Sequence, residues 1–220
     1  MMQLIRQRLP CLLLVALLCL CLLSACGQGG ENGETEPPDT APHGADFYAS
    51  ESDLSPYVRL GDYTGLTVIA KEGETRQDAI WRAVGEQAEV LAVPEGEIDY
   101  YYRSLTAQYR YYASLKDLSY EEILSSLGLS EDRLREEAIT LATEDLIYYA
   151  VLRDSGVTLS PEETDETGAL YASYVEMFSS APYSYSEEYV RTQMKKQILE
   201  TMLHDKLSDF LLQHNTVSEG

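Results

Sequence analysis

Helix-capping signals followed by apolar residues three or four positions apart recur between residues 75 and 214, and they constrain the fold most. Thr75 and Asp78 open the first such stretch, in which Ile80, Trp81, Val84 and Ala88 share a helical spacing. Ser119 and Glu122 have the spacing of a capping box, and Gly128 follows where a short helix would end. A chain with this pattern is predicted to be mainly α-helical.

Three further helices are expected from the same kind of signal. Ser130 precedes an acidic first turn and an apolar face that ends near Gly156. Ser160-Pro161-Glu162-Glu163 has a cap, a proline and a capping-box glutamate, which favours another helix start. Ser186 begins the last predicted helix, which runs to about His214 and would be about 40 Å long at 1.5 Å per residue. Such a helix predicts an elongated domain.

The tyrosines of the predicted helix after Pro94 set its apolar face. Ile98, Tyr102, Leu105, Tyr109 and Tyr112 recur in steps of three and four, so this stripe is predicted to face the core. Upstream, only residues 57–70 read as extended, because Leu66, Val68 and Ala70 alternate. The expected class is therefore mainly α, with one short extended N-terminal segment.

The first residues indicate export. A basic start precedes an apolar run from Cys11 to Leu23, which has the length of a signal peptide and is too short for a permanent membrane span. Leu23-Ser24-Ala25-Cys26 resembles the lipobox of bacterial lipoproteins, which implies cleavage before Cys26 and a lipid on its sulfur. The alternative is an ordinary signal peptide that ends beside an incidental cysteine. Several acyl chains would anchor the chain stably, whereas one binds only marginally.

Three segments follow from this interpretation. Residues 1–25 are the predicted lipoprotein signal peptide, residues 26–55 the lipidated cysteine with a disordered acidic tether, and residues 56–217 a helical domain. All four cysteines lie at or before Cys26, so the domain has no disulfide framework. A net charge of −21 argues against nucleic-acid binding and against a polybasic contact with lipids.

The order of several segments resembles the C-terminal domain of trigger factor. Tyr57–Val68 resembles the strand that leads out of that family's ribosome-binding domain, and residues 88–95, 126–138, 156–163 and 206–212 match later pieces in the family's order. The resemblance implies a helical chaperone body, a frame that extracytoplasmic foldases with parvulin domains share in related form. It does not extend to a ribosome-binding domain, to a parvulin domain, or to the FKBP-type prolyl isomerase domain, for which residues 70–76 leave no room.

The surplus of tyrosine, 17 residues in all, supplies candidate peptide contacts, because a large ring with a polar tip suits varied partners. Consecutive tyrosines cannot all face one core, so some are expected on a surface or in a groove. The candidates are Tyr100, Tyr101, Tyr111, Tyr174, Tyr183 and Tyr185. Met194 and Met202 are expected in the core. Whether the candidate tyrosines bind peptide or simply form an amphipathic surface is left open by the sequence.

No catalytic constellation stands out. His204 and His214 lie ten residues apart without a cysteine, an HExxH motif or another ligand cluster, and paired glutamates such as Glu136-Glu137 read as solvated helix faces. We therefore expect no metal, no cofactor and no enzymatic activity. The leading hypothesis is a lipid-anchored chaperone at the extracytoplasmic face of the cell membrane that binds unfolded exported proteins. The alternatives are an adaptor or structural lipoprotein with one specific protein partner and, third, a peptidyl-prolyl isomerase.

Overall fold

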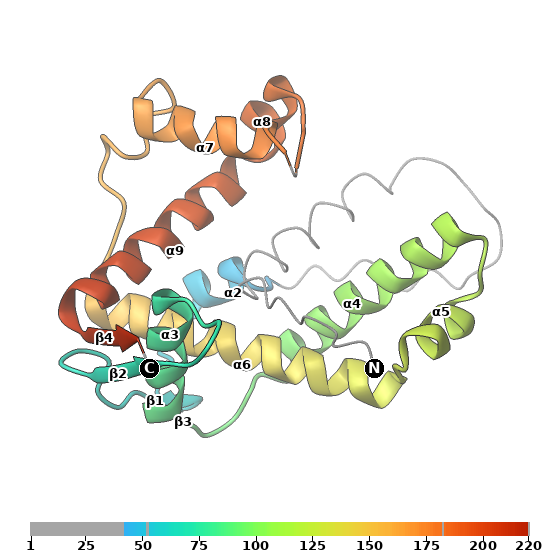
Figure 1. Cartoon of the computed structure of the whole chain (residues 1–220), viewed down its shortest axis with the longest axis horizontal. Helices are drawn as coiled ribbons and strands as arrows, with labels where there is room; N and C mark the ends of the chain where they lie inside the picture. The colour runs from blue at the N-terminus through green and yellow to red at the C-terminus, as the bar shows by residue number, and fades with distance from the viewer. Residues whose placement is uncertain (1–41, 52, 182, 220) are drawn as a thin grey trace. The chain divides into compact units, whose positions relative to one another are not determined.

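The structure, a computed structural model, describes residues 42–51, 53–181 and 183–219, and these form eight helices and four short strands (Figure 1). The prediction of a mainly helical class is confirmed. The chain divides into two compact units. Unit 1 comprises the described residues up to Arg59 and Glu89–Ala150, and unit 2 comprises Leu60–Ala88 and the described residues from Val151 onward.

Unit 1 is built on three helices that follow one another in the chain. A two-residue antiparallel ladder places Val58 opposite Val90 and Arg59 opposite Glu89. The three helices are α4 (Glu95–Lys116), α5 (Tyr120–Leu127) and the part of α6 (Glu131–Ser155) that ends at Ala150. Unit 1 also contains the short helix α2 (Ala45–Ser50) and the strands β1 (Val58–Arg59) and β3 (Glu89–Val90).

Two apolar clusters hold the helices of unit 1 together. The start of α4 packs on α6 through Ile98, Tyr101, Leu105, Ala138, Leu141 and Ala142. The end of α4 packs with α5 and the start of α6 through Ala113, Ile123, Leu124 and Leu134, with Tyr102, Tyr109, Tyr120 and Leu129 at the margin. In the second cluster, Ala113 is the buried residue from the end of α4. The neighbouring Tyr111 and Tyr112 are exposed.

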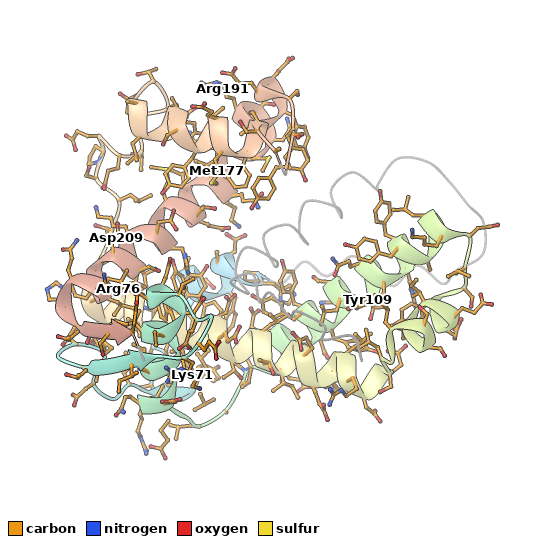
Figure 2. All side chains as sticks on the ribbon, viewed as in Figure 1. Lys71, Arg76, Tyr109, Met177, Arg191 and Asp209 are labelled. Atoms are coloured by element: carbon orange, nitrogen blue, oxygen red, sulfur yellow. The ribbon has the colours of Figure 1, made fainter. Side chains whose placement is uncertain are left out.

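The predicted face of α4 is confirmed at Ile98 and Leu105, which are buried, and is wrong at Tyr112. Tyr101 is buried at 3% exposure, whereas Tyr112, predicted in the core, is 42% exposed. Tyr102 and Tyr109 are half-buried, and Tyr109 can be located on α4 in Figure 2. Three consecutive tyrosines cover more than half of the helix circumference, so spacing alone does not choose which of them faces α6.

The helix boundaries of unit 1 agree with the predicted capping chemistry. The Ser119 hydroxyl accepts from the N–H of Glu122 at 3.2 Å, and the Glu122 carboxylate accepts from the N–H of Ser119 at 2.8 Å. Gly128 ends α5 with φ = 68°, a left-handed conformation that glycine adopts without steric cost. The capping box predicted from these residues is confirmed.

Unit 2 combines a parallel two-stranded sheet with four helices. β2 (Thr67–Ala70) pairs with β4 (Thr216–Glu219), with Val68 opposite Val217. The alternation predicted for β2 is confirmed, because Val68 and Ala70 are buried and Ile69 between them is exposed. β4 was not predicted. The helices are α3 (Arg76–Gln87), α7 (Ala169–Ser179), α8 (Glu187–Gln193) and α9 (Lys195–His214), and Figure 2 labels Met177 on α7 and Arg191 on α8.

The last predicted helix is two helices. The chain leaves helical geometry at Met194, where φ is −109° and ψ is 13°, and this residue separates α8 from α9. Met194 is itself buried, as is Met202, so the prediction that both methionines lie in the core is confirmed. The break lets α8 pack against α7 as well as α9, and this tertiary packing overrides the continuous helical pattern of the sequence.

The capping box predicted at Ser160 forms, but no helix follows it. Ser160 and Glu163 exchange their hydrogen bonds, and Lys206 of α9 adds an ion pair to Glu163 at 2.5 Å. Beyond Thr164 the Asp165 side chain accepts from both the N–H and the hydroxyl of Thr167. These local bonds compete with helix propagation, so the segment stays a turn.

The predicted disordered tether also ends too late. Within its range, residues 45–50 form α2, and Tyr48 is buried at 1% exposure. The surrounding glycine-, proline- and acid-rich composition gives no indication that Tyr48 is buried. The signal peptide, Cys26 and the rest of the predicted tether, up to residue 41, lie outside the described residues and stay predictions.

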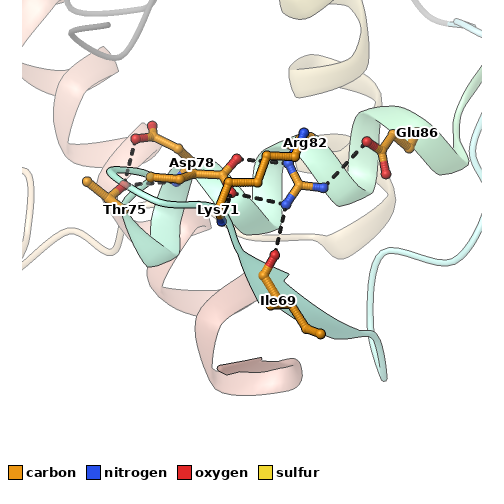
Figure 3. A network of polar contacts seen from close by, with 7 residues as sticks. Ile69, Lys71, Thr75, Asp78, Arg82 and Glu86 are labelled. Atoms are coloured by element: carbon orange, nitrogen blue, oxygen red, sulfur yellow. Dashed lines mark hydrogen bonds and ion pairs between the residues drawn. The ribbon is translucent and has the colours of Figure 1, made fainter. Parts of the chain in front are cut away.

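The connection from β2 to α3 is short and closed by ion pairs (Figure 3). Arg82 of α3 donates to both oxygens of Glu74 at 2.8 and 3.0 Å and to the carbonyl oxygen of Ile69 at 3.1 Å. The bonds from Arg82 and the N–H of Lys71 lower the pKa of Glu74 to about 2. These bonds fix the five residues that connect the end of β2 to the start of α3.

Candidate peptide-binding surface

One face of α4 is buried at its start and exposed at its end. With 100° per residue, Leu115 lies directly in line with Glu97, and Tyr111 and Tyr112 lie within about 60° on either side. Glu97 is fully buried, whereas Leu115 is 61% exposed and Tyr111 is also exposed. This face of α4 is therefore covered at Glu97 and uncovered at Tyr111 and Leu115.

The exposed residues form what we call the arm tip: Tyr111, Tyr112, Leu115 and Leu118. The rings of Tyr111 and Tyr112 lie 6.3 Å apart, and Gln108 donates to the Tyr112 hydroxyl at 3.2 Å. Asp117, which ends α4 in a left-handed conformation, turns the chain into α5. In Figure 1 the C-terminal half of α4 points away from α6 with α5 beside it.

This surface suits adaptable apolar contact more than chemistry. Two tyrosine rings and two leucine side chains offer apolar area, and the tyrosine hydroxyls and Gln108 add polar groups that bind water or a peptide backbone. Exposed apolar side chains that cluster, rather than occur singly, mark interaction sites. The arm tip is therefore the candidate peptide-binding surface of unit 1.

The six tyrosines predicted to contact peptide do not share this surface. Tyr111 belongs to the arm tip, but Tyr100 is half-buried and stacks on His43 with ring centroids 5.1 Å apart. Tyr101 is buried and donates to Asp145; burial and that carboxylate raise the pKa of Tyr101 well above its usual value. Tyr101 is therefore a core residue.

The other three predicted tyrosines belong to unit 2 and are half-buried. Tyr174 of α7 donates to Asp205 of α9 at 2.7 Å. The ring of Tyr183 lies 5.3 Å from that of Phe178, and the ring of Tyr185 lies 5.7 Å from that of Tyr189. Tyr174 and Tyr183 therefore contact partners that join α7 to α9 and to the segment after α7, whereas Tyr185 contacts a ring of α8.

Sequence reasoning missed Tyr112, Leu115 and Leu118. The helical spacing places Leu115 on the same face of α4 as Tyr101 and Leu105. No sequence motif marks these three residues as a binding surface. Which part of that face is covered depends on where α6 diverges from α4. That divergence is a tertiary property.

A buried carboxylate fixes the base of the same helix. Glu97 accepts from the N–H of Gly44 at 2.8 Å, and its other oxygen lies 3.1 Å from Nδ1 of His43. Burial raises the pKa of Glu97, against the lowering effect of these two partners. Tyr48 stacks on Tyr149 at 4.6 Å, so the segment around α2 is bound to unit 1 by both polar and apolar contacts.

The described residues contain no group of three or more histidine, cysteine, aspartate or glutamate side chains placed to hold a metal ion. Within the same ranges, no helix is both long enough and apolar enough to cross a membrane.

Comparison with known families agrees with this architecture. Residues 70–213 match the family described as the C-terminus of the bacterial trigger factor protein, and the chain belongs to that family. The resemblance inferred from the order of the sequence segments is thereby confirmed over this range. A search of curated proteins and a search of solved structures found no match.

Proposed function

We propose that this protein is a membrane-anchored chaperone that binds unfolded exported polypeptides at the extracytoplasmic face of the cell membrane. The observation that carries the proposal is the uncovered apolar stripe of α4 in a trigger factor C-terminal domain. Trigger factor is a chaperone, and an exposed surface of tyrosine and leucine gives this chain a place to hold apolar segments. Binding by burial of apolar area requires no cofactor and no nucleotide.

The location rests on the sequence of the first residues. The signal-like run and the Leu23-Ser24-Ala25-Cys26 motif would place a lipid on Cys26 and the helical units outside the cytoplasm. The acyl chains would then supply membrane binding without help from the acidic protein surface. Clients would be met as they leave the export channel.

Aggregation assays test the chaperone activity directly. The full chain in detergent is mixed with a chemically denatured client protein, and light scattering is followed after dilution. We expect suppression at a few-fold molar excess, and we expect the Tyr111→Ser/Leu115→Ser variant to lose most of it. The matched control is Ile139→Ser/Leu170→Ser, which changes two exposed apolar residues outside the arm tip. Absence of suppression by the folded wild type would rule the activity out.

Metabolic labelling tests the anchor. Cells that express the chain are fed an alkyne-tagged fatty acid, and the membrane fraction is probed for labelled protein. The wild type should carry label and the Cys26→Ser variant should not. Equal labelling of the two would exclude Cys26 as the lipid site.

A single stoichiometric partner recovered by crosslinking in the membrane, in place of many unrelated exported proteins, would favour an adaptor.

A further inference from the structure

The sheet of unit 2 has one edge with unpaired backbone groups. The N–H of Thr216 donates to the carbonyl oxygen of Leu66 at 2.9 Å, and Val68 lies opposite Val217. Successive residues of a strand direct their backbone groups to opposite edges, so Thr216 and Ser218 pair with β2. The N–H and C=O groups of Val217 and Glu219 point to the outer edge, where no backbone partner is found among the described residues.

The opposite edge of the sheet is occupied. Ile69 directs its carbonyl oxygen away from β4, and Arg82 fills that position with a hydrogen bond of 3.1 Å. Arg82 is fixed in turn by Glu74 and Glu86, and the turn between β2 and α3 lies over the same side (Figure 3). The sheet is therefore protected on the β2 side and open on the β4 side.

Nothing in β4 blocks a further strand. Thr216, Ser218 and Glu219 are exposed, and Val217 is half-buried because α3 packs on the inner face. The strand has no proline, lysine or bulge, and its protection is limited to its short length and the charge of Glu219. On the outer face the exposed Ile69 lies opposite Ser218, so an added strand would extend a surface that already has an apolar residue.

We propose that β4 binds an extended segment of a client polypeptide by strand addition; this proposal rests on the chaperone function proposed above. The backbone groups of Val217 and Glu219 repeat every two residues, and an extended main chain is the ligand with the matching repeat of donors and acceptors. Main-chain bonds require no particular side chain, so unrelated clients can be held. Glu219 and the acidic surplus of the chain disfavour acidic segments.

A substitution at Val217 tests the outward backbone groups of β4 without removing the bonds that pair β4 with β2. Proline at this position removes the outward N–H and adds a ring on that side, while the inward bonds of Thr216 and Ser218 stay in place. The matched control Val217→Ala keeps the N–H. The probe is a fluorescein-labelled peptide of alternating valine and threonine with a lysine at each end, and its Kd for the full chain in detergent is measured by anisotropy.

We expect Val217→Pro to weaken peptide binding about tenfold or more, and Val217→Ala to stay within about twofold of the wild type. A second measurement does not depend on the variant folding: a probe N-methylated at alternate residues should bind the wild type at least about tenfold more weakly. Equal binding of the two probes, or equal binding by Val217→Pro and wild type, would overturn strand addition.

Sedimentation of the same samples tests whether a second copy of the chain, in place of a client, binds this edge. A dimer that is lost in Val217→Pro while peptide binding is unchanged would assign β4 to a second copy of the chain and overturn the proposal. The two proposals also fail separately. Wild-type suppression of aggregation with peptide binding unaffected by Val217→Pro contradicts only strand addition, whereas failure to suppress aggregation contradicts the chaperone function itself.

Discussion

Replacing Tyr48 tests whether the segment before β1 is part of unit 1. Its ring is 1% exposed and stacked on Tyr149 at 4.6 Å. A tyrosine ring buries about 180 Å², and at about 25 cal/mol per Å² this contributes about 4.5 kcal/mol. Truncation of large aromatic residues in cores costs about 3–5 kcal/mol. The loss is limited by the free energy of docking α2, since the segment can detach, so we expect Tyr48→Ala to lower the free energy of unfolding by about 3 kcal/mol.

Two substitutions serve as controls for this measurement. Tyr48→Phe keeps the ring and removes only a hydroxyl whose bond to the carbonyl oxygen of Ala142 is 3.4 Å long, so its cost should be below about 1 kcal/mol. Tyr112→Ala makes the same kind of change at an exposed tyrosine and should also cost below about 1 kcal/mol. The assay is urea unfolding followed by far-ultraviolet circular dichroism. A Tyr48→Ala variant as stable as the wild type would show that residues 42–51 behave as a tether, contrary to this reasoning.

Further predictions concern glycine and pH. Gly85 lies inside α3 with open space at its Cβ position, so Gly85→Ala should stabilise the protein by about 0.5–1 kcal/mol. Gly128 has φ = 68°, so Gly128→Ala should destabilise the protein by a similar amount. Thermal unfolding of both variants checks that the two effects have opposite signs. The pKa of Glu74 is lowered to about 2 in the folded protein, so its ion pair with Arg82 stabilises the fold above the ordinary carboxyl pKa of 4.5 and ceases to do so as pH falls through about 2. The stability difference between Glu74→Gln and wild type in urea should therefore be largest near neutral pH and shrink between pH 4.5 and 2, and a constant difference across that interval would contradict it.

The helix boundaries were predictable because their chemistry is local. Ser119 and Glu122 satisfy each other's backbone groups within one turn, and Gly128 ends the helix by its own conformational freedom. The residues that determine these boundaries are neighbours in the sequence. A reading of single segments is sufficient for features of this kind.

The elements that were missed depend on distant partners. β4 exists because Thr216–Glu219 pairs with a strand about 150 residues earlier, and its own sequence has no strong strand pattern. α2 is bound by Glu97 and Tyr149, which no property of residues 42–51 reveals. The exposure of the arm tip depends on which side of α4 is left uncovered by α5 and α6. For the same reason Tyr101 and Tyr112 were assigned to the wrong sides of their helix.

Site-specific crosslinking from the arm tip tests the central claim, that exposed apolar residues of α4 hold unfolded clients. A photoreactive phenylalanine analogue replaces Leu115, and the same analogue replaces Ile139, an exposed apolar residue on α6, as the control. Each full chain is irradiated with a reduced, permanently unfolded client. We predict strong crosslinks from position 115 that an excess of unlabelled unfolded client removes, and weak ones from position 139. Equal yields from the two positions, or none from position 115, would contradict the assignment of client binding to the arm tip.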